Sequence, residues 1–233
     1  MSSHFFHPIT LKANQLHKLK RMNFMFYFLL ALTTVLAVTA SPGQPVLDIN
    51  GDIISDGSYY VIPLNYGTKG GGLTLSPRGD NLCPLFVGQR ISEVNRGIPV
   101  KFSNWRSKVQ FVPQSENLNI EMDVKAKFCV RSTYWWVTAA ESHFRKLFVT
   151  AGPKPELGED TSKSFFQIKK TGVLVNSYTV AFCSKDNGCS DVGIFMDEHG
   201  IRRLALGSMP LPVMFMKATE EDTSSKNMYI LSE

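Results

Sequence analysis

The sequence consists of short apolar segments separated by turn-forming residues, and this pattern restricts the fold more than any other feature. Gly, Pro, Asn, Asp or Ser interrupts the apolar segments roughly every 10–15 residues, and no segment keeps the period of a helix. In one segment, Leu118, Ile120, Met122 and Val124 alternate with polar residues and so share one face of a strand. The pattern predicts an all-β barrel or sandwich. Its predicted strands are 59–64, 73–76, 85–89, 109–113, 118–124, 127–130, 134–139, 146–151, 164–170, 178–183, 192–197 and 211–217.

An apolar segment near the N-terminus predicts a secretory signal. It runs from about residue 24 to 38, follows the basic residues at 18–21, and ends in the small-residue pattern Val38-Thr39-Ala40. A membrane-spanning helix needs about 20 apolar residues, which is more than this segment offers. We therefore expect residues 1–40 to be removed as a signal peptide, with Met22 as an alternative start. The mature chain is expected to be secreted, with the vacuole as the alternative destination, and to have no further membrane contact.

The rest of the chain predicts one domain, residues 41–218, of nearly balanced charge. The protein has 25 Lys and Arg against 20 Asp and Glu, and four of the basic residues lie in the predicted leader. That leaves 21 basic against 20 acidic residues, whereas nucleic-acid binding requires a net basic face. We therefore expect no nucleic-acid partner. Residues 219–233 are polar and predict a flexible C-terminal tail.

The four cysteines, Cys83, Cys129, Cys183 and Cys189, all follow the leader and predict two disulfides. Cys183 and Cys189 flank a Lys-Asp-Asn-Gly turn, so we expect these two to pair and Cys83 to pair with Cys129. Zinc is the competing interpretation, but it is disfavoured because no C-x-x-C spacing occurs. We expect neither a metal nor a cofactor.

The sequence offers no recognisable catalytic constellation. After the leader only His143 and His199 remain, both in polar segments, whereas a Ser-His-Asp triad needs a buried, oriented His. The glycine-rich segment 68–76 lacks the ending of a phosphate-binding loop and predicts a flexible hairpin tip. We therefore do not expect an enzyme. The pair Trp135-Trp136 should place one ring inside and one at the surface, which keeps a sugar- or protein-binding surface as a rival function.

Several sequence blocks follow one another along the chain: PVLDINGDIISDGSYYVIPL at 45–64, LCPLFVGQ at 82–89, GIPVKF at 97–102, CSDVGIFMDEHGIRRLAL at 189–206 and PLPVMF at 210–215. In this order they resemble the plant Kunitz inhibitors, the soybean trypsin inhibitor family. The four cysteines also lie where that family has its two disulfides. The resemblance implies a β-trefoil of about twelve strands in three pseudo-repeats, and a protease inhibitor. The first block contains the turn dipeptide Asn50-Gly51, which predicts a hairpin, with Tyr60 and Ile62 then pointing into the barrel.

The segment SNWRSKVQF, residues 103–111, stands where the resembling inhibitors offer a bond to a serine protease. Trypsin-like enzymes have an Asp in the specificity pocket, so a Lys or Arg of this loop would form a charge-assisted pair there. Counting back from Phe111 places the reactive bond at Lys108–Val109. The alternative is Arg106–Ser107. Counting forward from Gly97 places the reactive residue on Ser107 itself, which would favour a different protease.

Asn104 and Trp105 are expected to support this loop together with Asp56, which stands where the family often has an Asn. An ionised Asp cannot donate a hydrogen bond, so the resemblance implies a less rigid loop and weaker inhibition. The expected protein is a secreted monomer that inhibits a trypsin-like serine protease, with a role in plant defence, storage or protease regulation. The alternatives are a non-inhibitory β-trefoil that binds carbohydrate or protein, or an inhibitor of cysteine or aspartic proteases.

Overall fold

The computed structural model describes residues 26–29, 43–64, 70–78, 81–124, 129, 132–138, 146–156, 160–184 and 188–219. The chain divides into two units, Met1–Pro42 and Gly43–Glu233. In the first unit, residues 26–29 form a helical turn; the rest of the predicted leader lies outside the described residues. The same holds for the predicted tail after Thr219. Of the helical residues that are described, none belongs to a helix long and apolar enough to cross a membrane.

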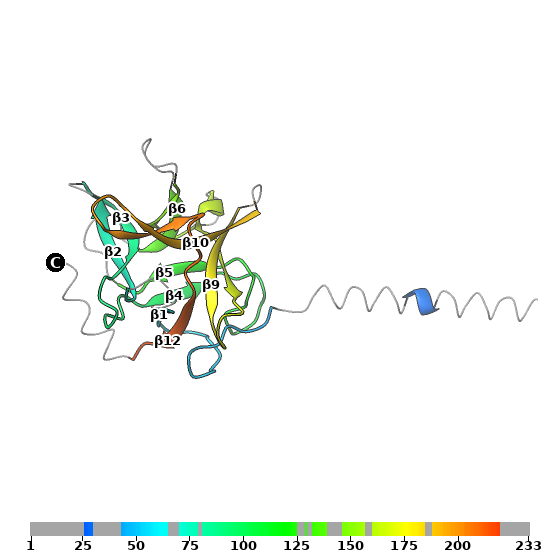
Figure 1. The fold of residues 1–233 in the computed structure, drawn as a ribbon. Coiled ribbons are helices and arrows are strands. Elements are labelled where there is room, and N and C mark those ends of the chain that lie inside the picture. Colours follow the sequence, from blue (N-terminus) through cyan, green and yellow to red (C-terminus); the bar gives the residue numbers. More distant parts are fainter. Residues whose placement is uncertain are drawn as a thin grey trace, which may run out of the picture. The chain divides into compact units, whose positions relative to one another are not determined.

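The described part of the second unit contains twelve strands and one short 3-10 helix (Figure 1). Their bounds are β1 Tyr59–Pro63, β2 Leu73–Arg78, β3 Asn81–Gln89, β4 Val100–Ser103, β5 Asn119–Met122, β6 Tyr134–Thr138, β7 Phe148–Gly152, η1 Thr161–Ser164, β8 Phe166–Lys170, β9 Tyr178–Ser184, β10 Gly188–Met196, β11 Arg202–Leu206 and β12 Val213–Lys217.

Six of these strands close into a barrel. Strand β1 pairs with β4 and β12, β4 pairs with β5, and β9 pairs with β8 and β12. The ring is completed between β5 and β8 by a bridge at Leu118 and Phe166, whose backbones exchange two hydrogen bonds of 2.9 Å. Closure leaves no strand edge exposed along the barrel, which removes a surface for unwanted strand pairing.

The other six strands form three hairpins, β2–β3, β6–β7 and β10–β11, which lie at one end of the barrel (Figure 1). The hairpins also pair with one another in a ring, because β3 contacts β7, β7 contacts β11 and β11 contacts β3. A six-stranded barrel capped by a ring of three hairpins is a β-trefoil. The predicted fold is therefore confirmed, including the strand number.

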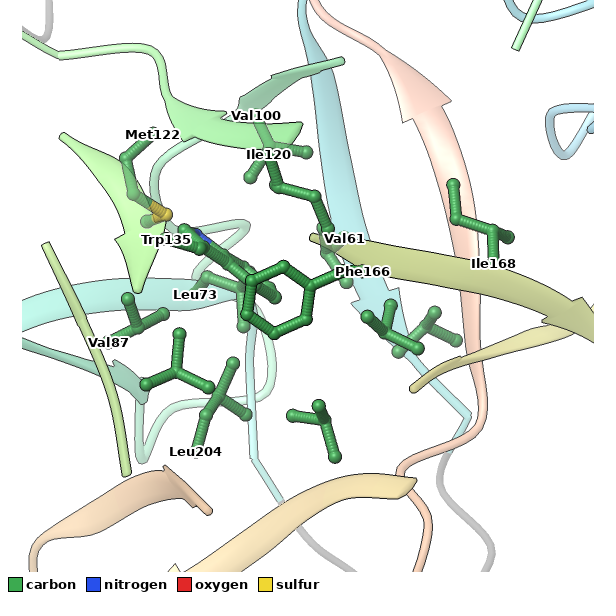
Figure 2. Close-up of a cluster of buried hydrophobic side chains, with 14 of the residues drawn as sticks. Val61, Leu73, Val87, Val100, Ile120, Met122, Trp135, Phe166, Ile168 and Leu204 are labelled. Atoms are coloured by element: carbon green, nitrogen blue, oxygen red, sulfur yellow. The ribbon is translucent and has the colours of Figure 1, made fainter. Parts of the chain in front are cut away.

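The hydrophobic core is built from side chains of both the barrel and the hairpins. Figure 2 shows Val61, Val100 and Ile120 of the barrel beside Leu73, Val87 and Leu204 of the hairpins. At its centre the indole of Trp135 meets the ring of Phe166 edge-on, with centroids 5.4 Å apart. The neighbouring Trp136 is only half-buried, so the prediction of one buried and one surface ring is confirmed.

Two disulfides connect parts of this unit. Cys83 pairs with Cys129 and Cys183 with Cys189, which is the predicted pairing. The first encloses a long loop and the second joins the facing ends of β9 and β10. Because a long closed loop removes more freedom from the unfolded chain, the Cys83–Cys129 bond contributes more to stability, about 4 kcal/mol on the chain-entropy estimate.

The strand prediction is wrong in some places. Residues 109–113 contain no strand. Val112 instead accepts a backbone hydrogen bond from the Val46 nitrogen at 2.9 Å and donates one to the Ile54 carbonyl oxygen at 2.8 Å. Residues 127–130 lie mostly outside the described residues. Conversely, the prediction omits β4 and β11, because VKFS and RRLAL mix cations with apolar residues.

The predicted orientation of β1 is wrong by one residue. Tyr59 and Val61, rather than Tyr60 and Ile62, belong to the central core cluster. Side chains alternate across a strand, so a shift of one residue exchanges the two faces. Here the sequence could not decide, because both faces of YYVIP are apolar and Tyr60 is also buried.

The glycine run is packed, so the prediction of a flexible tip is wrong for Gly70–Gly72. All three glycines are buried. A Cβ on Gly72 would lie 1.8 Å from the carbonyl oxygen of Arg96, so only glycine lets these two backbone segments approach.

Candidate functional site

The 103–111 loop begins at the end of β4 and belongs to the connection to β5. The two strands pair in antiparallel register, from Val100 opposite Met122 to Ser103 opposite Asn119. The chain leaves the ladder at Asn104, whose positive φ of 60° is tolerated by Asn better than by most residues. The loop is therefore held at its base by a regular hairpin.

Exposure alternates along the loop with the period of an extended chain. Asn104, Arg106, Lys108 and Gln110 are exposed, whereas the residues between them are half-buried. Both candidate cations thus point to solvent, and within the described part of the chain neither forms an ion pair. The Ser107 hydroxyl lies inside, buried and without a hydrogen-bond partner among the residues that the structure describes.

Hydrogen bonds tie the loop backbone in two places. The indole nitrogen of Trp105 donates to the carbonyl oxygen of Val109 at 2.9 Å, and the Trp105 ring packs against the core. The backbone nitrogen of Ser107 donates to the carboxylate of Glu116 at 3.0 Å. These contacts hold the loop in one shape before any partner arrives.

A buried amide anchors the start of the loop. Asn119, 1% exposed, accepts a hydrogen bond from the Asn104 amide at 2.7 Å. Its own amide nitrogen donates to the carbonyl oxygen of Ser164 at 2.8 Å. Asn119 therefore links the loop to η1, which is distant in the sequence.

Charged and phenolic groups surround the base of the loop on β4 to β6. Lys101 pairs with Asp123 at 2.7 Å, and Ser58 also donates to Asp123. Burial raises the pKa of Glu121, although a hydrogen bond from Tyr134 and the charge of Lys101 oppose this. Burial and the Glu121 charge also raise the pKa of Tyr134. Among the described residues, no group of three His, Cys, Asp or Glu is placed to hold a metal ion.

Comparison with known proteins assigns the family. The chain matches the legume Kunitz family, described as trypsin and protease inhibitor, over residues 46–217. It is also 53% identical over 215 residues to Kunitz trypsin inhibitor 4 of Arabidopsis thaliana, covering 90% of this chain and 98% of that one. The chain belongs to the plant Kunitz inhibitor family. Members of this family are inhibitors rather than enzymes, as the sequence predicted.

Solved structures of the family share the fold. Soybean trypsin inhibitor is 29% identical and superposes with a TM-score of 0.61, covering 76% of this chain and all of the other. A complex of that inhibitor with porcine pancreatic trypsin matches at 26% identity and a TM-score of 0.59, covering 76% of this chain and 100% of that one.

Asp56 does not support the loop in the way expected from its position in the Kunitz family. Its side chain is exposed, and the side-chain hydrogen bonds that hold the described loop come from other residues. Asn104 and Trp105, the other two expected supports, do make bracing contacts. In the free protein the loop is thus held from its own hairpin.

Sequence reasoning missed Glu116 and Asn119. Glu116 lies in the polar segment QSENLN, where a carboxylate is ordinary and carries no signal. Asn119 occupies the position between Leu118 and Ile120 that the alternating pattern assigns to the outer face. Its burial arises because η1 covers it, which only the tertiary structure reveals.

Proposed function

We propose that this chain is a secreted inhibitor of a trypsin-like serine protease and that the 103–111 loop acts as a substrate mimic. The observation that carries the proposal is the alternation along the loop, which presents Arg106 and Lys108 outward on a backbone already tied by hydrogen bonds. A preset loop loses little entropy on binding, so a modest interface can bind tightly. The kinship with Kunitz trypsin inhibitors supports the choice of partner.

Lys108–Val109 is the proposed reactive bond. The Lys108 side chain is free to enter a pocket with an Asp at its base, where it would form a charge-assisted hydrogen bond. Ser107 is a poor pocket residue because its hydroxyl is buried and its backbone nitrogen is already bonded to Glu116. Arg106–Ser107 is kept as the alternative, since Arg106 is equally exposed.

The same contacts explain how such a loop could be cut without being released. The Trp105–Val109 hydrogen bond crosses the Lys108–Val109 bond, so both new ends would stay in place after cleavage. Both candidate bonds also lie inside the loop closed by Cys83 and Cys129, so the pieces remain covalently joined. New amine and acyl group stay adjacent, and resealing competes with hydrolysis.

Titration of trypsin and chymotrypsin with the full chain, secreted from a eukaryotic host, tests the proposal. We expect stoichiometric inhibition of trypsin, strongly reduced by Lys108→Ala and little changed by Arg106→Ala. Lys170→Ala, which removes an exposed lysine outside the loop, is the matched control. Loss with Arg106→Ala alone would move the bond to Arg106–Ser107. If the protein inhibits neither trypsin nor chymotrypsin, the proposal is overturned.

The secretion part of the proposal has its own readout. N-terminal sequencing of the protein recovered from the medium should begin close to Ser41. Recovery only inside the host cells, or with residues 1–40 intact, would contradict secretion through a cleaved signal.

A further inference from the structure

We propose that Glu116 biases which of the two candidate bonds is resealed after cleavage: it supports resealing at Lys108–Val109 and disfavours it at Arg106–Ser107. The inference rests on the proposed inhibitory function and adds a positioning residue to it. Glu116 would act on the loop ends through charge and hydrogen bonding, without entering the protease pocket.

The geometry places the carboxylate of Glu116 at one end of the Arg106–Ser107 bond. Its Oε2 atom accepts a hydrogen bond from the nitrogen of Ser107 at 3.0 Å, and that nitrogen is the atom released if this bond is cut. Glu116 itself is well anchored. The preceding residue, Ser115, donates its backbone N–H to Ile168 of β8 at 2.9 Å. Two residues later, Leu118 is bonded in both directions to Phe166.

Cleavage at Arg106–Ser107 would produce an amine beside a carboxylate. The serine oxygen of the protease forms an ester with the Arg106 carbonyl carbon, the C–N bond breaks, and the Ser107 nitrogen leaves with a proton as an amine. Resealing requires the lone pair of that amine to attack the ester carbonyl and expel the serine oxygen. A carboxylate at hydrogen-bond distance favours the charged ammonium, which has no lone pair. Water then takes the acyl group, leaving an Arg106 carboxylate, and the ion pair stabilises the nicked chain.

Cleavage at Lys108–Val109 places the new amine elsewhere. The nitrogen released is that of Val109, while Ser107 keeps its amide and its hydrogen bond to Glu116. The same carboxylate therefore holds the acyl side of this bond in position. The Val109 carbonyl is held independently by Trp105. Glu116 thus opposes resealing at one bond and supports it at the other.

Variants whose loop keeps only one of the two cations separate the two cases, because trypsin cleaves after Lys or Arg. Lys108→Ala leaves only Arg106–Ser107 for trypsin, and Arg106→Ala leaves only Lys108–Val109. Each is made with Glu116 and with Glu116→Gln, because Gln keeps an acceptor for the Ser107 nitrogen but has no charge. The full chain is incubated with a trace of trypsin until the ratio of intact to nicked protein is constant. Mass spectrometry after reduction measures this ratio, since the disulfide otherwise joins the pieces.

We expect Glu116→Gln to raise the intact-to-nicked ratio about fivefold in the Lys108→Ala loop, the size of one partly exposed ion pair. In the Arg106→Ala loop, Glu116→Gln should change the intact-to-nicked ratio by less than about twofold. In the same loop, Glu116→Ala should lower the ratio, because it also removes the acceptor for the Ser107 nitrogen. Glu198→Gln, at an exposed carboxylate in the β10–β11 turn, is the control.

Two results would count against the inference and are distinguishable. Equal ratios for the Lys108→Ala loop with Glu or Gln at 116 would overturn it and leave the inhibitory function standing. If neither loop inhibits trypsin or is cut by it, the proposed function fails first and the inference fails with it.

Discussion

The indole nitrogen of Trp105 and the carbonyl oxygen of Val109 lie 2.9 Å apart, and their hydrogen bond bridges the loop across both candidate bonds. The contact joins a side chain on one side of each bond to the backbone on the other. It therefore opposes separation of the ends after a cut at either position. In this chain the indole supplies a donor that Asp56 cannot supply when ionised.

Replacing Trp105 by Phe tests this bridge. The ring can still pack against the core, but its N–H donor is lost, at a net cost of about 1 kcal/mol. We expect trypsin to nick the variant about fivefold faster than the wild-type protein, with initial inhibition retained. Gel electrophoresis under reducing conditions over a time course measures the nicking rate.

Trp136→Phe is the matched control for Trp105→Phe. Trp136 also donates its indole N–H to a carbonyl oxygen, that of Pro153 at 2.8 Å, but it lies on β6 outside the loop. If both variants are nicked at the same rate, the effect reflects general loss of stability and the bridge has no special role.

Asn119→Ala should destabilise the protein and loosen the start of the loop. The substitution removes the buried amide of Asn119, and with it the hydrogen bond from Asn104 and the hydrogen bond to the Ser164 carbonyl oxygen. We expect a loss of about 2–3 kcal/mol in the free energy of unfolding, measured by urea denaturation. Asn117→Ala, which removes an exposed hydrogen bond to Gln167, should cost less than about 0.5 kcal/mol. Equal losses for the two variants would contradict the anchoring role.

The two disulfides should differ in their effect on stability. Replacing Cys83 and Cys129 by Ser should cost about 4 kcal/mol, and replacing Cys183 and Cys189 about 2 kcal/mol, because the second closes a much shorter loop. Thermal unfolding of both double variants measures the difference. The first variant should also lose inhibition permanently once nicked, since its pieces can separate. If the nicked form of this variant still inhibits trypsin, the predicted loss of inhibition is wrong.

Asp197 should make the free energy of unfolding fall at low pH. Burial raises the pKa of its carboxyl, but hydrogen bonds from Ile201, Arg203 and His199 and the Arg203 charge outweigh burial and lower it overall. A carboxyl with a lowered pKa stabilises the fold above its unfolded pKa of about 4, and this contribution disappears as pH falls through the folded pKa.

Asp197→Asn is therefore expected to reduce stability by about 2 kcal/mol at pH 7, because Arg203 is buried and loses its charged partner. The difference from wild type should shrink as the pH falls through the folded pKa of Asp197. Urea denaturation at several pH values measures it, with Glu198→Gln as the exposed control. A difference that is constant with pH would show that charge is not the cause.

Much of the loop could be predicted because its signals are local. The cations Arg106 and Lys108 are visible in the sequence, although β4, the strand that ends before them, is missing from the predicted strands. The Ser107–Glu116 contact could not be predicted, because a carboxylate in a polar loop can accept hydrogen bonds from many nearby donors and the sequence does not select one. The burial of Gly72 was likewise hidden, since its cause is the approach of Arg96 from another segment.

By itself the sequence determined the all-β class, the two disulfides and the position of the cationic loop. Alternation and turn residues act over a few residues, and the close spacing of Cys183 and Cys189 leaves Cys83 to pair with Cys129. Only the tertiary structure decided which face of β1 is inside, and which side chains hold the loop. Those outcomes depend on contacts such as Asn119 with Ser164, between segments 45 residues apart. Such contacts exist only after the barrel has closed.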